Sequence, residues 1–150
     1  MRNKHAVFLT ILSIVVFGAA LTQVGFYTGA GPRAAWGRGW YLLLIGWAGP
    51  MGLEFSWFAN PLLLTTWALC IGEKKTAALL LSVLTLVPMI SFYFTDQILV
   101  DEGGGRAKIT GYGSGYWLWL SSAVLALAAA AIMRKEPNQT PATRLLGPRF

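Results

Sequence analysis

Long runs without charged side chains constrain this sequence more than any other feature. Residues 6–27 contain no Asp, Glu, Lys or Arg. A helix of this length, at about 1.5 Å of rise per residue, crosses a hydrocarbon core of about 30 Å. Charged residues make up only 12% of the chain, whereas soluble globular domains contain about 25%. The sequence therefore predicts an all-α integral membrane protein, and the lipid bilayer is its predicted surrounding partner.

The second apolar block, 39–72, carries one charge, Glu54. As a single helix it would be about 50 Å long, which is too much for one crossing and too little for two. The sequence Gly-Pro-Met-Gly at 49–52 is the best place for a break, because proline opens a helix well and glycine weakens one. We therefore expect a short interfacial or re-entrant segment at about 40–48 and a membrane-spanning helix at 50–71.

The complete prediction is a four-transmembrane-helix bundle over residues 1–133. Its spans are 6–27, 50–71, 76–95 and 116–133, and a basic, proline-containing tail follows at 134–150. The first span has an alternative interpretation as a cleaved signal peptide, because Arg2 and Lys4 precede an apolar run and Gly18-Ala19-Ala20 is typical of a cleavage site. The apolar run continues past that site to Tyr27, which favours a retained anchor.

The distribution of Lys and Arg predicts the orientation. Eight of the twelve lie in the N-terminal segment, between the second and third spans, and in the tail. Because these residues are enriched in cytoplasmic loops, we expect both termini in the cytoplasm and the longer connections, 28–39 and 96–115, outside. The glycines at 103–105 and at 111, 113 and 115 predict that the second of these connections is a flexible loop. Compact loops and a short N-terminus favour a bacterial inner membrane.

Two polar residues of the second span are candidates for an intramembrane site. Glu54 would lie one turn inside the span, where a carboxylate must face protein or water. Asn60 precedes Pro61 near the middle of the span, where proline is expected to kink the helix and free a carbonyl group. The two residues would line one polar pocket. Alternatively, Glu54 pairs with Arg33 or Arg38 among the headgroups and Asn60 bonds to another helix.

Aromatic residues are distributed unevenly between the two predicted membrane boundaries. All five tyrosines and four of the seven tryptophans fall at the outer boundary, together with four of the six acids. Rings and carboxylates together suit a protein partner or a cationic ligand, although aromatic rings also anchor membrane proteins at the interface. The candidate partner surface comprises Trp36, Trp40, Tyr41, Asp96, Asp101, Glu102, Tyr112, Tyr116 and Trp117.

Small residues also follow one face of the fourth span, at Ser122, Ala126 and Ala130. Such a stripe lets helices approach closely. It predicts a helix contact within the bundle or, alternatively, between copies in a homo-oligomer.

The sequence offers little for catalysis. With one cysteine and one histidine, it provides no disulfide framework and no metal site rich in these residues. We expect no cofactor. We also expect no nucleic-acid partner, because the basic residues lie in small clusters between apolar blocks. The leading hypothesis is a non-enzymatic accessory subunit or interaction partner, immunity-like in character, for another membrane or periplasmic protein. The alternatives are a proton- or cation-coupled transporter or channel subunit that uses Glu54 and Asn60, and an enzyme that uses Glu54 with outer carboxylates.

Overall fold

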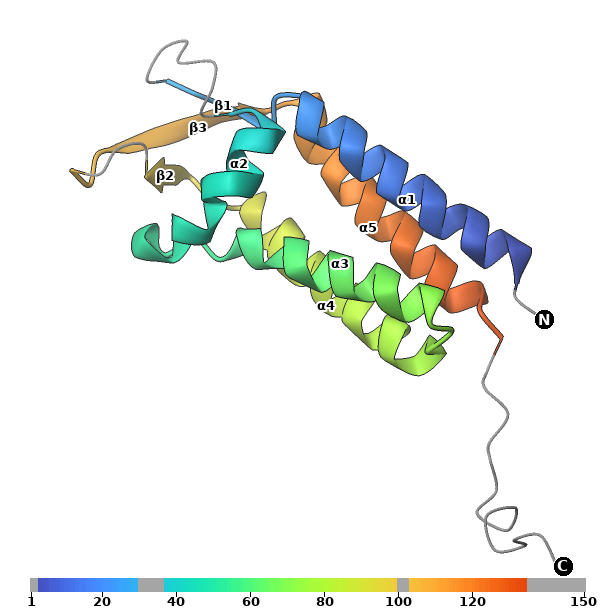
Figure 1. Ribbon diagram of the computed structural model, residues 1–150. Helices are drawn as coiled ribbons and strands as arrows, with labels where there is room; N and C mark the ends of the chain where they lie inside the picture. Colours follow the sequence, from blue (N-terminus) through green and yellow to red (C-terminus); the bar gives the residue numbers. More distant parts are fainter. Residues whose placement is uncertain (1–2, 30–36, 100–102, 135–150) are drawn as a thin grey trace, which may run out of the picture.

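The computed structural model describes residues 3–29, 37–99 and 103–134, which are mostly helical (Figure 1). Three helices, α1 (Lys4–Thr22), α4 (Lys75–Phe92) and α5 (Ser114–Ile132), are long and apolar enough to cross a membrane. Large apolar side chains point away from the protein on their outer faces, as at Phe8, which is 63% exposed, and Val87, which is 60% exposed. Helices that are apolar on all faces are typical of membrane spans.

The helices pack as two neighbouring pairs. Helix α1 runs along α5, while α3 (Ala59–Ile71) runs along α4, and α4 also contacts α5 (Figure 1). The small-residue face of α5 lies inside the bundle, where Ser122, Ala126 and Ala130 are all fully buried. Ala126 belongs to a cluster with Phe17 of α1 and Leu63 of α3. This stripe is therefore a helix contact within the chain.

The helix predicted at 50–71 is wrong over its first nine residues, because α3 begins at Ala59. Helix α2 (Gly39–Ile45) is followed by two 3-10 turns, η1 (Gly46–Gly52) and η2 (Ser56–Phe58). Leu53 ends η1 with a left-handed backbone, φ 63°, and a helix cannot continue through such a residue. At 13 residues, α3 is about 20 Å long, which is shorter than the hydrocarbon core.

The expected kink at Pro61 is also absent, and its position explains why. Pro61 is the third residue of α3 rather than a residue of its middle. In the first turn of a helix the backbone N–H has no partner within the helix, so proline removes no hydrogen bond there. The Asn60-Pro61 pair therefore starts a helix instead of bending one.

A three-stranded antiparallel sheet lies at one end of the bundle, where the sequence predicts loops (Figure 1). Strand β3 (Arg106–Tyr112) is central and pairs with β1 (Phe26–Thr28) on one side and β2 (Gln97–Leu99) on the other. Phe26 lies opposite Tyr112, and Ile98 lies opposite Ala107. The prediction of a flexible loop is therefore wrong for 106–112, where apolar and polar residues alternate as they do in a half-buried strand.

The opposite end of the bundle gathers the start of α1, the α3–α4 turn and the end of α5 (Figure 1). The side-chain amide of Asn3 donates to the Ile132 carbonyl over 2.6 Å. The Lys75 ammonium donates to the carbonyl oxygens of Ala131 and Met133 over 2.9 and 2.6 Å. These contacts satisfy carbonyl groups at the C-terminal end of α5, which carries partial negative charge. The predicted tail lies outside the described residues from position 135 onward.

Candidate functional site

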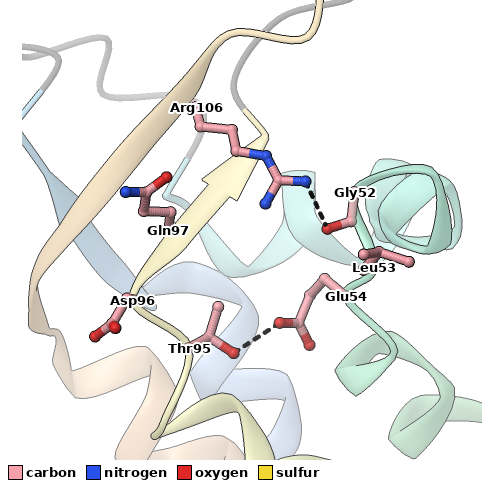
Figure 2. A pocket seen from close by; sticks show the side chains of 7 residues that line it. All are labelled: Gly52, Leu53, Glu54, Thr95, Asp96, Gln97 and Arg106. Atoms are coloured by element: carbon pink, nitrogen blue, oxygen red, sulfur yellow. Dashed lines mark hydrogen bonds between the residues drawn. The ribbon is translucent and has the colours of Figure 1, made fainter.

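An open pocket of about 380 Å³ lies at the sheet end of the molecule, between η1 and the strands. We call it the outer pocket. Figure 2 shows the Glu54 carboxylate facing Thr95, and the Arg106 guanidinium reaching from β3 toward Gly52. The pocket thus brings both signs of charge into one volume. Its lining residues are Gly52, Leu53, Glu54, Thr95, Asp96, Gln97 and Arg106.

Glu54 is held in the outer pocket by two hydrogen bonds. One carboxylate oxygen accepts from the backbone N–H of Ser56 over 2.9 Å, and the other accepts from the Thr95 hydroxyl over 2.8 Å. The side chain is half-buried and stands in the irregular segment between η1 and η2. The prediction that Glu54 lies one turn inside a helix is therefore wrong, because the preceding glycine- and proline-containing turn is not part of α3. Of the two arginines considered as partners, Arg33 lies outside the described residues.

Asn60 does not share a pocket with Glu54. Its side chain is 8% exposed, and its carbonyl oxygen accepts a hydrogen bond from the indole N–H of Trp119 over 2.9 Å. This bond joins the start of α3 to α5. The structure therefore separates the two members of the predicted intramembrane site, leaving Glu54 in the outer pocket and Asn60 in a contact between helices.

A second polar contact between helices lies deeper in the core. The indole N–H of Trp67 donates to the Ser13 hydroxyl over 2.8 Å, and this hydroxyl donates to the Ser122 carbonyl over 2.6 Å. Ser13 and Ser122 are fully buried. The chain of bonds connects α3, α1 and α5, and it satisfies an indole donor that would be costly to leave unpaired.

Aromatic rings form a continuous cluster beside the outer pocket. Tyr93 stacks on Tyr112 with ring centroids 5.2 Å apart, and the rings of Tyr112 and Tyr116 are 4.8 Å apart. Trp117 lies against Tyr93 at 6.2 Å and against Tyr116 at 5.1 Å. We call these four residues the aromatic cluster. Its members come from the end of α4, from β3 and from the start of α5, so the sheet is what brings them together.

Hydrogen bonds to backbone carbonyl groups hold two tyrosines of the aromatic cluster in place. The Tyr112 hydroxyl shares its one proton between the carbonyl oxygens of Phe92 and Tyr93, at 2.9 and 3.0 Å, and the Tyr116 hydroxyl donates to the Met89 carbonyl over 3.1 Å. Burial raises the pKa of the Tyr112 phenol above its ordinary value, and nearby Tyr93, Glu54 and Asp96 raise it further. Tyr112 therefore remains a neutral donor, and it stands close enough to sense the charge of the outer pocket.

The structure brings together only part of the predicted partner surface. Tyr112, Tyr116 and Trp117 join the aromatic cluster, and Asp96 lines the outer pocket. Trp40 and Tyr41 lie on α2 and contact each other with centroids 5.7 Å apart. The remaining predicted members, Trp36, Asp101 and Glu102, lie outside the described residues.

Two residues of this region were not singled out from the sequence. Tyr93 directly follows α4. In the sequence it is one of several aromatic residues at a predicted membrane boundary, and nothing distinguishes it from the others. Arg106 enters the sequence argument only as a charge in a loop, although its alternation with Ala107, Lys108 and Ile109 is a strand signal. In the sheet Arg106 lies opposite Leu99 of β2, and its side chain lines the outer pocket.

The arrangement is suited to binding. In the described part of the chain, no group of three or more His, Cys, Asp or Glu side chains is placed to hold a metal ion. The outer pocket instead combines two carboxylates, Glu54 and Asp96, with the Arg106 guanidinium, and such groups recognise charged ligands through charge-assisted hydrogen bonds. Comparisons of the chain with models of protein families, with curated proteins and with solved structures find no match.

Proposed function

We propose that this chain is a four-span protein of a bacterial inner membrane, with both termini in the cytoplasm, and that it acts non-enzymatically as an accessory subunit or immunity-like partner of another membrane or periplasmic protein. The excess of Lys and Arg near the termini and at 74–75 supports this orientation. Helix α1 packs along α5 and shares the Ser13 contact with it, which supports a retained anchor. Helix α3 extended by η2, Ser56–Ile71, supplies the short fourth span.

The aromatic cluster is the observation that carries the proposal. Tyr93 and Trp117 are about half exposed, at 49% and 50%, although their neighbours Tyr112 and Tyr116 are fixed by hydrogen bonds. Large rings held in place bind a partner at a low cost in conformational entropy, and Trp and Tyr dominate the energetically important contacts of protein interfaces. The outer pocket beside the cluster adds charged groups of both signs, as in the polar rim of an interface.

The geometry gives less support to transport through Glu54 and Asn60. Between the outer pocket and the opposite end of the bundle, the core contains the fully buried side chains of Leu63, Met89 and Thr66. Because Asn60 is already bonded to Trp119, it supports helix packing rather than a polar path toward Glu54.

Site-specific photocrosslinking in the native membrane tests the proposal. A photoreactive residue is placed at position 93 or 117, and a control is placed at Leu80, which is 64% exposed on the apolar face of α4. We expect one defined protein adduct from positions 93 and 117 and none from position 80. An adduct of twice the chain mass would identify the partner as a second copy. Labelling of lipid alone at all three positions would contradict an interaction role.

A matched pair of substitutions separates binding from folding. Trp117→Ala should weaken capture of the crosslinked protein at position 93, because it removes an exposed ring of the cluster. Trp47→Ala removes a ring that is 60% exposed on η1, outside the aromatic cluster, and should leave capture unchanged. Equal loss in both variants would show that exposed rings matter only as membrane anchors.

A further inference from the structure

The charges of the outer pocket restrict what it can bind. The lining carries two carboxylates, Glu54 and Asp96, and one guanidinium, Arg106, so a simple cation leaves Arg106 without a counter-charge and a simple anion is repelled by the carboxylates. A ligand with a positive and a negative group on one short skeleton satisfies both. The volume of about 380 Å³ lies in the range of about 300–1,000 Å³ that is typical of small-molecule sites, so a group of headgroup size fits.

Glu54 and Arg106 both keep hydrogen-bonding capacity for such a ligand. An ionised carboxylate offers about four lone-pair positions, and the two bonds from Ser56 and Thr95 to Glu54 use one on each oxygen. A guanidinium carries five N–H donors, more than the long contact of 3.5 Å from Arg106 to the Gly52 carbonyl uses. Arginine binds phosphate with two parallel hydrogen bonds, and a carboxylate accepts hydrogen bonds from a primary ammonium.

The surroundings of the pocket add an apolar component. Next to Glu54 along the chain, Met51, Leu53 and Phe55 are 79%, 76% and 53% exposed. Leu53 itself lines the pocket (Figure 2). Exposed large apolar side chains in a row mark a surface that contacts another apolar surface, and at the boundary of a membrane span that surface is acyl chain. The pocket therefore combines sites for two opposite charges with a neighbouring site for hydrocarbon.

We propose that the outer pocket binds a phosphoethanolamine group as the headgroup of a phosphatidylethanolamine lipid. Arg106 holds the phosphate, Glu54 accepts from the ammonium, and Met51, Leu53 and Phe55 contact the acyl chains. Binding at this pocket requires that the chain lies in a membrane, but it does not depend on the aromatic cluster having a protein partner. The crosslinking experiment and the lipid experiment therefore succeed or fail separately.

Native mass spectrometry of the full chain in detergent, titrated with defined lipids, tests this assignment. The probes are phosphatidylethanolamine, phosphatidylcholine and phosphatidylglycerol with identical acyl chains, together with free phosphoethanolamine. We expect phosphatidylethanolamine to bind about tenfold more tightly than the other two lipids, because only its headgroup offers charged N–H donors to the carboxylate. Choline has no N–H, and the glycerol hydroxyls of phosphatidylglycerol are uncharged donors. Equal binding of the three lipids would overturn the proposal. Free phosphoethanolamine binding as tightly as the lipid would overturn the lipid as the source of the headgroup.

Three variants assign the two charges. Glu54→Gln should reduce phosphatidylethanolamine binding to the level of phosphatidylglycerol, whereas Arg106→Gln should weaken the binding of all three lipids by about tenfold. Lys108→Gln is the matched control, because Lys108 is exposed on the same strand and does not line the pocket. If Glu54→Gln lowers the helix content measured by circular dichroism, Arg106→Gln decides the outcome, since its side chain is exposed. Equal losses in Lys108→Gln and Arg106→Gln would refute the assignment.

Discussion

Replacing Ser13 with alanine isolates the contribution of one buried polar contact to the bundle. The Ser13 hydroxyl is fully buried, accepts from the Trp67 indole and donates to the Ser122 carbonyl. The substitution leaves the indole donor unpaired, at a cost of about 1–3 kcal/mol. Hydrogen bonds between membrane helices contribute less in double-mutant cycles, about 0.6 kcal/mol on average and about 1.7 at most. We therefore expect the free energy of unfolding to fall by about 1–2 kcal/mol.

Reversible unfolding in bicelles, followed by far-ultraviolet circular dichroism, measures this change. Trp67→Phe in the Ser13→Ala background removes the unpaired donor, so it should cost less there than in the parent chain, with a coupling of about 0.6–1.7 kcal/mol. Thr85→Val is the control, because the buried Thr85 hydroxyl donates only to Leu81 of its own helix. No measurable loss in Ser13→Ala, or a loss no larger than that of Thr85→Val, would refute the reasoning.

Three further predictions concern the two ends of the bundle and its strand. A methyl group at Gly115 would lie 2.8 Å from the Val24 carbonyl oxygen, so Gly115→Ala should lower the free energy of unfolding by about 1–3 kcal/mol. A methyl group at Gly18 would point into open space, so Gly18→Ala should stabilise α1 by about 0.5–1 kcal/mol. Both changes are measured by thermal unfolding. Because the pKa of Tyr112 is raised from 10.0, the folded state holds this proton more tightly than the unfolded state, and stability should fall as pH rises above 10. An ultraviolet titration of tyrosinate should lose one transition above pH 10 in Tyr112→Phe. Lys75→Ala removes an ammonium from the C-terminal end of α5 and should lower stability by about 0.3–1 kcal/mol, and an unchanged melting temperature would count against this contact.

Three of the four predicted spans correspond to long apolar helices, because uninterrupted apolar runs favour such helices. The first was predicted to reach residue 27, but α1 ends at Thr22 and residues 26–27 belong to β1. The prediction failed at the second apolar block, where composition alone did not show how far the chain stays irregular after Pro50. Leu53 adopts a left-handed backbone, a conformation that is rare for leucine and has no signature in the sequence. The predicted place of Asn60 in the middle of a span and its predicted pocket with Glu54 failed for the same reason, because both depend on where α3 begins.

At the sheet end of the molecule, the sequence indicated which types of residue gather but not how they are arranged. The sequence grouped tyrosines and tryptophans at one predicted boundary, and Tyr112, Tyr116 and Trp117 do lie together. Their stacking depends on β3, a segment whose flanking glycines predict a loop. The strand signal at 106–109 is only four residues long, and short alternations compete poorly with glycine-rich neighbours. Arg106 and Glu54 lie far apart in the sequence. The pairing of β2 with β3 and the hydrogen bond from Thr95 to Glu54 together bring them to one pocket.

The order of strands in the sheet has a consequence for biogenesis. The central strand, β3, is the last of the three to be synthesised, and in the described residues β1 and β2 pair only with it. The backbone groups that the two earlier strands use in the sheet therefore stay without their partner until β3 has been synthesised. The sheet end of the protein is therefore completed in a single late step, which follows the synthesis of β3.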